Sequence, residues 1–353
     1  MPILKPTSVV MAELIDEISK AETEILFQIF YIDNDEVTAR WIELLVSKAL
    51  AGVKVFCLVD ALGAKNFGSS AIENKLKTSG VHLEYFNWLT PWNGRSKSLW
   101  YFRNHKRSLI VDNKVVHLGG WCMGDKTMEW IESHIVNRDP EVIQDASTDF
   151  WNMYKYAHKT QFKFVNQKRY VQNGKTFSYT YQAPLLRSRY IYYSHKRLVQ
   201  NANEKIVLIT PYFAPIHGLL HQLRKAAHRG VHIEIYIPKK TDHFFVDLVA
   251  KTYILNLLHL GVHIYFSDRM IHAKANLFDN TLYVGTMNLD TVSLRYNFEN
   301  GLYAKDEATT KEFLADVEIL KLTCTRVTLA EWKKRGRLSR FLDEIMKLLR
   351  PFV

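Results

Sequence analysis

Two short blocks of residues in this 353-residue sequence carry types that could do chemistry on a phosphate. Each block has a histidine, a cation two residues later and an aspartate five residues after that: His105, Arg107 and Asp112, and His272, Lys274 and Asp279. On a β-strand, residues two apart project from the same face, so the imidazole and the cation converge on one anionic group. Arginine in the first block keeps the charge and offers a planar fork to phosphate oxygens.

A single block of this kind is a modest signal, because short motifs often match by chance. Two blocks at equivalent places in an internal repeat are much harder to obtain by accident. The alternative, in which His105 and His272 are ordinary core histidines bonded to their neighbours, is therefore disfavoured. The other twelve of the fourteen histidines receive that interpretation by default.

Each block is followed by a glycine-led segment that could supply further donors. Asn280 next to Asp279 predicts a turn, after which the returning chain presents Thr286 and Asn288 near His272. In the first half, Gly120 and Cys122 stand at the corresponding places. The first half therefore offers fewer side-chain donors.

The elements that position these blocks come from the internal repeat. Glu24 to Asp60 reads as a strand, a helix, a glycine and a second strand, and Lys205 to Pro238 repeats that order. Ser79 to Phe86 (SGVHLEYF) is then answered by Leu260 to Phe266 (LGVHIYF). Each half predicts a mainly parallel sheet flanked by helices, so we expect an α/β protein of two similar lobes related by pseudo-twofold symmetry.

The repeat also predicts domain boundaries. Residues 1–135 form the first lobe and residues 204–328 the second. Residues 136–203 form an aromatic and basic connection that ends in a linking helix, and its aromatic residues favour a seam between the lobes over a lipid-facing loop. Residues 329–353 are predicted to form a basic amphipathic helix.

That last helix gathers its apolar residues on one face: Leu338, Phe341, Leu342, Ile345, Leu348 and Leu349. Basic residues surround them: Lys333, Lys334, Arg335, Arg337, Arg340, Lys347 and Arg350. The pattern suits the surface of an anionic bilayer. It suits equally a helix docked on the protein with a solvated basic face, and the sequence does not choose.

Composition describes a well-packed globular chain with 47% hydrophobic and 24% charged residues. Its 47 basic and 36 acidic residues give a net charge of +11, which indicates an anionic partner. Three cysteines without metal-ligand spacing exclude a zinc motif and a disulfide framework. The N-terminal residues do not resemble a signal peptide, and no stretch reaches the roughly 18 apolar residues of a spanning helix.

The paired blocks resemble the phospholipase D superfamily, and more closely its bacterial cardiolipin synthase branch. The similarity is most specific in Ile271 to Leu302 (IHAKANLFDNTLYVGTMNLDTVSLRYNFENGL) and Ile209 to Pro215 (ITPYFAP). It is looser in Asn104 to Asp112 (NHKRSLIVD) and Trp130 to Glu132 (WIE). The resemblance spans nearly the whole chain.

The resemblance implies that the two histidines meet across the lobe interface in one active site. One attacks phosphorus and forms a phosphohistidine, while the other protonates the leaving alkoxide and later deprotonates the incoming alcohol. We assign these roles to His105 and His272 in that order, although the sequence itself does not order them. Lys274 and Arg107 would stabilise the phosphoryl oxygens in place of a metal, and no cofactor is needed.

The remaining site residues also follow from the resemblance. Thr286, Asn288 and Gly120 would lie at the phosphate, and Glu299 and Glu132 would orient the histidines. The catalytic set would be completed by Asp112 and Asp279. Cys122, where the family usually has asparagine, puts rate and substrate preference in question.

The implied function is phosphatidyl transfer to phosphatidylglycerol, at an anionic phospholipid membrane. The enzyme would be cytoplasmic and peripherally associated with the inner face of the cell membrane, with no obligate protein partner. An alternative is a phosphodiesterase that hydrolyses phospholipid or nucleic acid, which the charge of +11 would suit. A third, motivated by Arg107 and Cys122, is a non-catalytic member that binds membranes or a protein.

Overall fold

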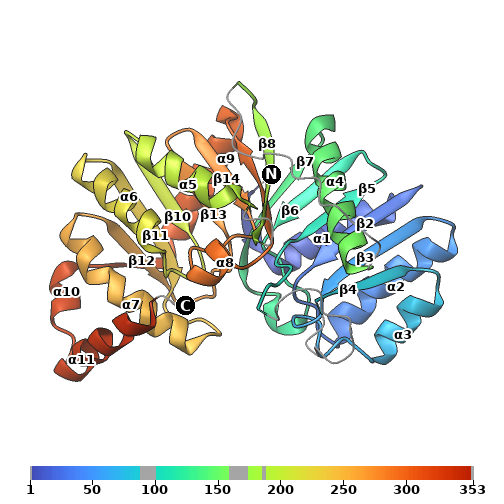
Figure 1. The fold of residues 1–353 in the computed structure, drawn as a ribbon, viewed down its shortest axis with the longest axis horizontal. Coiled ribbons are helices and arrows are strands. Elements are labelled where there is room, and N and C mark those ends of the chain that lie inside the picture. Colours follow the sequence, from blue (N-terminus) through green and yellow to red (C-terminus); the bar gives the residue numbers. More distant parts are fainter. Residues whose placement is uncertain (1, 88–100, 159–173, 185–187, 351–353) are drawn as a thin grey trace.

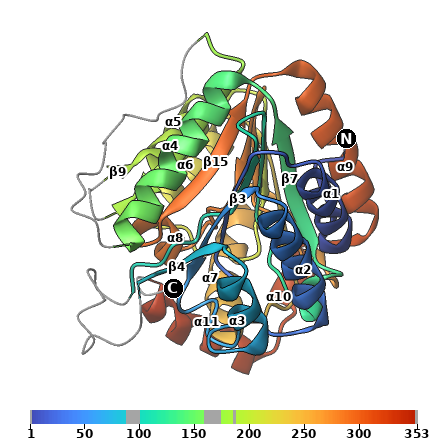
Figure 2. The same cartoon turned by 90° about the vertical axis from the view of Figure 1, so that its right-hand side faces the viewer.

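The computed structural model describes residues 2–87, 101–158, 174–184 and 188–350. Two lobes lie side by side, each with a sheet flanked by helices (Figure 1). Figure 2 shows α4 (Pro140–Ala157) on one side of the strands, and α1 (Thr7–Ser19) and α9 (Glu307–Leu322) on the other. The α/β class and the two-lobe organisation predicted from the repeat are confirmed.

The first sheet has seven strands in the order β1-β7-β6-β5-β2-β3-β4. Their bounds are β1 Leu4–Pro6, β2 Glu24–Ile29, β3 Lys54–Asp60, β4 His82–Phe86, β5 Ser108–Val111, β6 Val115–Gly119 and β7 Ile131–Asn137. Besides α1 and α4, this half contains α2 (Glu36–Leu50) and α3 (Ala71–Thr78). Asp35 and Ser70 cap α2 and α3 by accepting hydrogen bonds from N–H groups in the first turn of each helix.

The second sheet has nine strands in the order β16-β12-β11-β10-β13-β14-β15-β8-β9. Their bounds are β8 Phe177–Ala183, β9 Ser188–Arg189, β10 Lys205–Ile209, β11 His232–Pro238, β12 His263–Ser267, β13 Ala275–Phe278, β14 Thr281–Gly285, β15 Glu299–Ala304 and β16 Cys324–Val327. Its helices are α5 Tyr190–Asn201, α6 His217–His228, α7 Phe244–His259 and α8 Thr291–Arg295, besides α9. The order β12-β11-β10-β13-β14-β15 repeats β4-β3-β2-β5-β6-β7 of the first sheet.

Both sheets are mixed, so the expectation of mainly parallel sheets is wrong. Among the described strands, parallel pairing is limited to β2–β3 and β3–β4 in the first sheet and to β10–β11 and β11–β12 in the second. The histidine blocks lead instead into the hairpins β5–β6 and β13–β14, whose tight turns force antiparallel pairing. The second turn is one residue shorter, because Phe278 pairs with Thr281 whereas Val111 pairs with Val115.

The two motif aspartates stand in these turns and not in the catalytic set to which they were assigned. Both adopt left-handed backbone conformations, with φ of 52° for Asp112 and 50° for Asp279. The Asp279 carboxylate accepts backbone N–H bonds of 2.9–3.0 Å from residues 203–205, where β10 begins. Asp112 accepts the equivalent bonds from residues 22–24. Each aspartate thus fixes the edge of its sheet that lies opposite its histidine.

The predicted connection of residues 136–203 is divided between the lobes. Helix α4 packs on β2, β4, β5 and β6 of the first lobe and also on β8, which pairs with β15 and extends the second sheet. The predicted linking helix is α5. Residues 159–173 of this aromatic stretch lie outside the described residues. Tyr179 and Tyr181 are buried in a core that joins both sheets, as the seam interpretation expects.

The C-terminal segment forms two helices where one was expected. Gly336 has an extended ψ of 154° and separates α10 (Leu329–Lys333) from α11 (Arg337–Met346), which a 3-10 turn at Lys347–Leu349 follows. α10 and α11 pack against α7. The side chains of Arg337, Leu338 and Arg340 lie outside the described set. Among the described residues, every helix is too short or too polar to cross a bilayer.

The role of the turn aspartates can be tested by replacing Asp112 with alanine. Burial raises the pKa of Asp112, but the backbone N–H groups of Glu24, Thr23 and Glu22 outweigh it and hold the pKa below its ordinary value. Asp112→Ala is therefore expected to lower the free energy of unfolding in urea by about 1–3 kcal/mol at pH 7. The difference should disappear as the pH falls through the folded-state pKa, because the protonated carboxyl loses its advantage. If Asp112→Ala kept its stability but lost its turnover, Asp112 would instead have a catalytic role.

Candidate active site

Each block's histidine lies at the edge of its sheet where the parallel strands end. His105 precedes β5 and His272 precedes β13, and their exposed fractions are only 6% and 4%. The segment before His105 is fixed at this edge by the buried ion pair of Arg103 with Asp60, the last residue of β3. Asp60 also accepts a hydrogen bond of 2.8 Å from the backbone N–H of Asn104.

The backbone before each histidine pairs with the opposite lobe. His105 donates its N–H to the carbonyl of Phe298 at 2.9 Å, just before β15. His272 donates its N–H to the carbonyl of Ile131 at 2.8 Å, at the start of β7. The two contacts are equivalent under exchange of the lobes. Each histidine is therefore placed by a strand of the other half.

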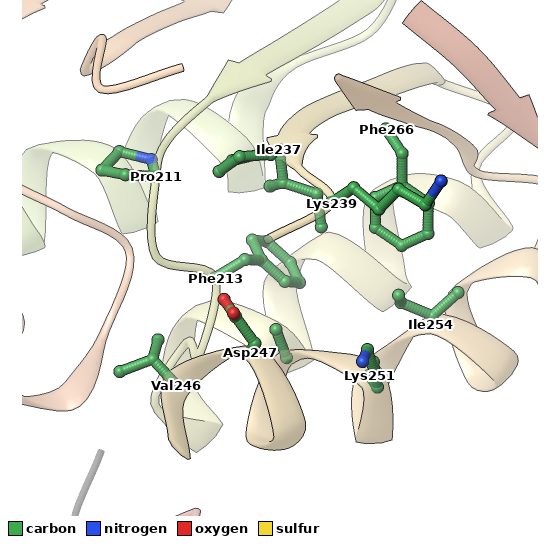
Figure 3. A pocket seen from close by; sticks show the side chains of 11 residues that line it. Pro211, Phe213, Ile237, Lys239, Val246, Asp247, Lys251, Ile254 and Phe266 are labelled. Carbon is green, nitrogen blue, oxygen red and sulfur yellow. The ribbon is translucent and has the colours of Figure 1, made fainter. Parts of the chain in front are cut away.

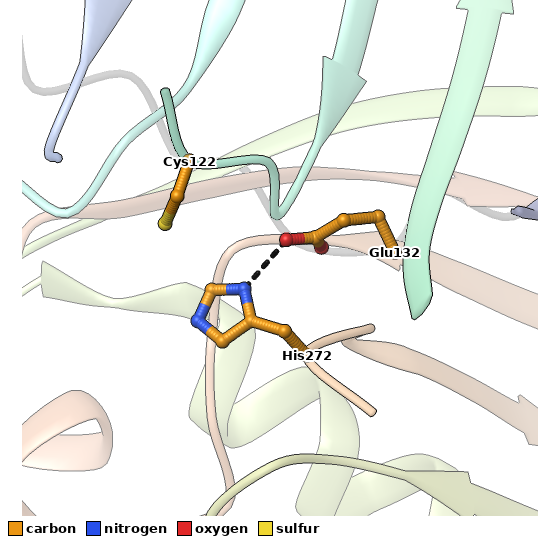
Figure 4. Close-up of side chains that lie close together, drawn as sticks. All are labelled: Cys122, Glu132 and His272. Carbon is orange, nitrogen blue, oxygen red and sulfur yellow. Dashed lines mark hydrogen bonds and ion pairs between the residues drawn. The ribbon is translucent and has the colours of Figure 1, made fainter. Parts of the chain in front are cut away.

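The carboxylates follow the same relation, since each comes from the lobe opposite the histidine that it contacts. Nδ1 of His105 lies 2.9 Å from an oxygen of Glu299, and Nδ1 of His272 lies 2.7 Å from Glu132 Oε1 (Figure 4). A carboxylate at Nδ1 orients the ring and leaves Nε2 for chemistry. The orienting contacts predicted for Glu299 and Glu132 are thus present, and each reaches the histidine of the opposite half.

The two cations are buried beside the histidines. Lys274 Nζ lies 2.9 Å from both ring nitrogens of His272 and donates to the His272 carbonyl at 2.5 Å. Arg107 donates to the His105 carbonyl at 2.6 Å and to the Trp121 carbonyl at 3.0 Å. The four side chains form one cluster, in which Arg107, Lys274 and His272 each lower the pKa of His105.

Burial and mutual repulsion shift the pKa values of this cluster. Burial lowers the pKa of Lys274 to about 7, with Arg107 adding to the effect and Glu132 opposing it. Burial, Arg107 and Lys274 hold the pKa of His105 well below its ordinary value. Burial raises the pKa of Glu132, but His272 and Lys274 overcome it and keep the carboxyl ionised. An anionic group bound between the cations would relieve their repulsion.

The residues predicted to bind the phosphate after each hairpin differ in whether they have a free polar atom. Thr286 donates its hydroxyl to Glu299 at 2.5 Å, so it supports the carboxylate and is not a free donor to phosphate. Asn288 is buried, and its Oδ1 has no hydrogen-bond partner among the described atoms. A Cβ on Gly120 would lie 2.9 Å from both Glu132 Oε2 and Lys274 Cδ, so serine or threonine would not fit there unchanged. Gly120 serves by its small size.

Two residues of the site were missed by sequence reasoning. Ser133 Oγ accepts the backbone N–H of Lys274 at 3.0 Å, and Asn300 Oδ1 accepts that of Arg107 at 3.3 Å. Each residue directly follows an orienting glutamate, so its position in the repeat was the available signal. Lys106, between His105 and Arg107, does not join the cluster, because its ammonium pairs with the buried Asp149 at 2.6 Å.

Comparisons with known proteins identify the family of this chain. The family model described as "Cardiolipin synthase, PLD-like domain" matches residues 14–154 and 196–320. The chain belongs to the phospholipase D superfamily, in its cardiolipin synthase-like branch.

Curated relatives of this phospholipase D-like chain include cardiolipin synthase of Clostridium perfringens, 30% identical over 97% of this chain and 74% of the relative. The major cardiolipin synthase of Bacillus subtilis is 29% identical over 96% of this chain and 72% of the relative. The fold is shared with phosphatidylserine synthase of Haemophilus influenzae, with a TM-score of 0.74 at 13% identity, over 99% of this chain and 92% of that one.

Within the described part of this phospholipase D-like enzyme, two groups of residues have the types that bind metals. Cys122, Glu132 and His272 lie within the site (Figure 4), and His232, Glu234 and His263 lie where β11 and β12 begin. Lys274 and Arg107 crowd the first group. In the second group, Lys321 Nζ lies 2.9 Å from the carboxylate of Glu234. The positive charge of Lys274 and Arg107 disfavours a metal cation at the first group, and at the second group Lys321 already neutralises the Glu234 carboxylate.

The tight fit at residue 120 gives a test of the site geometry. Gly120→Ala is expected to displace Glu132 and Lys274 and to lower kcat about a hundredfold, because small misplacements of catalytic groups are costly. Gly68→Ala is the matched control, since its new Cβ would meet nothing closer than 3.5 Å. Turnover should be measured on a water-soluble phosphodiester. Equal kcat values for the two variants would contradict the assigned packing.

Proposed function

We propose that this enzyme transfers a phosphatidyl group between phospholipids, joining it to the free hydroxyl of phosphatidylglycerol to form cardiolipin. The observation that carries the proposal is the reciprocal pair of histidines, each oriented by the other lobe's glutamate, around two buried cations. The curated relatives named as cardiolipin synthases support the choice of phospholipid among phosphodiester substrates.

In the first step, Nε2 of His105 attacks phosphorus while the bond from phosphorus to the leaving glycerol oxygen breaks. His105 suits this role because its lowered pKa keeps the ring neutral. His272 donates a proton to the leaving oxygen. Burial and Lys274 lower the pKa of His272 to about 4 in the free enzyme, and the negative charge of the bound phosphodiester raises it toward the value an acid needs.

In the second step, His272 takes a proton from the hydroxyl of a second phosphatidylglycerol, whose oxygen attacks the phosphohistidine. The phosphorus–nitrogen bond breaks and His105 returns to its neutral form. Lys274 and Arg107 stabilise the negative charge on the phosphoryl oxygens in both steps, so the proposed reaction proceeds without a metal or another cofactor. Water in place of the alcohol would make the same site a phosphodiesterase.

The proposed substrate places the enzyme at a membrane. We infer that it acts peripherally on the inner face of the cell membrane, where the net charge of +11 favours anionic lipid. Nucleic acid is the competing polyanion, because the same charge would attract it. No protein partner is required by the proposed reaction.

The function is tested with purified protein and phosphatidylglycerol vesicles, with new lipid identified by mass spectrometry. Wild type should form cardiolipin and release glycerol. His105→Ala and His272→Ala should each lower the rate by about a hundredfold to ten-thousandfold, while His221→Ala on α6 should be unaffected. No new lipid, with plasmid cleavage that both site variants lose, would replace the proposal with a nuclease.

The pKa of Lys274 predicts the pH dependence. The transition state needs its ammonium, so kcat/KM on a soluble phosphodiester, which already declines above the pKa of His272, should show a second and steeper alkaline limb as the pH rises through about 7. Lys274→Arg should move this alkaline limb upward by two units or more, roughly, because a guanidinium stays protonated. An alkaline limb that is identical in the variant would contradict the assignment of the limb to Lys274.

A further inference from the structure

The edge of the second lobe that carries the active site continues into α7. β11 ends at Pro238 on this edge, and α7 begins at Phe244 after a five-residue loop. Tyr212, in the segment after β10, donates its hydroxyl to Asp242 of that loop at 2.6 Å. Its neighbour Phe213 pairs with Leu289, which directly follows Asn288 of the site. The first turn of α7 is therefore tied to the active site through two contacts.

This first turn exposes two large aromatic side chains. Phe244 and Phe245 are 66% and 63% exposed, and their rings lie 5.9 Å apart. A mostly apolar hollow is lined by the α7 residues that follow, with Lys239, Asp247 and Lys251 also in its lining (Figure 3). Exposed aromatic rings suit the boundary between acyl chains and headgroups.

Helix α11 adds a second exposed apolar surface next to α7 (Figure 1). Met346 and Leu349 pack inward on the second lobe's core. The exposed apolar residues of this segment are Phe341, Leu342, Ile345 and Leu348. Phe341 is 62% exposed and Leu348 is 74% exposed. Large apolar side chains on a helix that packs against the protein are usually more buried than this.

The C-terminal segment also reaches the site. The carbonyl of Arg350 accepts the Thr291 hydroxyl at 3.3 Å, three residues after Asn288. The Arg350 side chain donates to Thr252 of α7 at 2.6–2.8 Å and stacks over Tyr253. The exposed residues of α7 and α11 thus belong to one edge of the protein, and that edge contains the active site.

The charges of this edge decide between possible occupants. Between Leu329 and Arg350 the chain has seven basic and three acidic side chains, and Lys239 and Lys240 are exposed before α7. A symmetric dimer through this surface would bring two basic faces together, which is unfavourable. An anionic bilayer matches both the charge and the apolar side chains.

We propose that Phe244 and Phe245 of α7, together with the exposed apolar residues of α11, form a docking face that inserts into the interface of an anionic bilayer. The face holds the active-site edge against the membrane, where the lipid phosphate can reach the two histidines. This inference rests on the proposed function, because it assumes that the substrate is a membrane phospholipid.

The test compares wild type with the double variant Phe244→Ser/Phe245→Ser in co-sedimentation with vesicles. The vesicles contain either phosphatidylglycerol mixed with phosphatidylcholine or phosphatidylcholine alone. The double variant should bind the anionic vesicles about tenfold or more weakly, because two aromatic side chains no longer leave water. Leu50→Ser is the matched control, since Leu50 is 74% exposed at the end of α2, on the opposite edge of the first lobe.

A soluble phosphodiester separates docking from chemistry, because both variants should hydrolyse it at the wild-type rate. That result with weakened vesicle binding supports the docking face even if the lipid product proves not to be cardiolipin. Equal vesicle binding by wild type and the double variant would overturn the inference. So would gel filtration in which the phenylalanine substitutions convert a dimer to a monomer while vesicle binding is unchanged.

Discussion

The rest of the structure depends on one constraint: each lobe supplies the glutamate that orients the histidine of the other lobe. Nδ1 of His105 lies against Glu299 and that of His272 against Glu132, so neither half contains a complete histidine–carboxylate pair. The halves must therefore be held in fixed register. The backbone bonds at Phe298 and Ile131 set that register. A single core that contains apolar residues of both sheets keeps it.

Burying the positive charges of the site costs free energy in the free enzyme. Arg107 and Lys274 are buried, and their nearest acceptors include backbone carbonyls and a histidine ring. The lowered pKa values of Lys274 and His105 report that cost, because buried cations repel further positive charge. A phosphodiester anion offsets it on binding. In the proposed mechanism, positive charge preorganised in the protein takes the place of a metal at the transition state.

The repeat unit was predictable because strand and helix periodicities are local properties of the sequence. The matching blocks at His105 and His272 also indicated a shared site. The mixed sheets were not predictable from the same pattern, because the direction of β6 relative to β5 depends on a turn of only three residues at Asp112. The aspartates were misassigned because a motif gives the spacing of residues but not where their side chains point. The two carboxylates bind backbone N–H groups where β2 and β10 begin, at the end of each sheet opposite the histidines.

Other features needed three dimensions. Gly120 reads as a missing donor in the sequence, yet Glu132 and Lys274 fill the space that a side chain would need. Ser133 and Asn300 lie beside the glutamates in sequence, but their bonds cross to the other lobe. Helix α11 has the amphipathic pattern that was predicted. Only packing shows that Met346 and Leu349 turn inward while Phe341 and Leu348 remain exposed.

The pairing of each histidine with the glutamate of the other lobe is most directly measured by nuclear magnetic resonance of histidine-labelled protein. The measurement uses long-range proton–nitrogen correlations of the imidazole rings. Signals of the two rings are assigned with His105→Ala and His272→Ala. The geometry predicts that Glu299→Gln perturbs the ring nitrogens of His105 and leaves those of His272 nearly unchanged, while Glu132→Gln does the reverse. Perturbation of the histidine in the same half as the substituted glutamate would contradict the account.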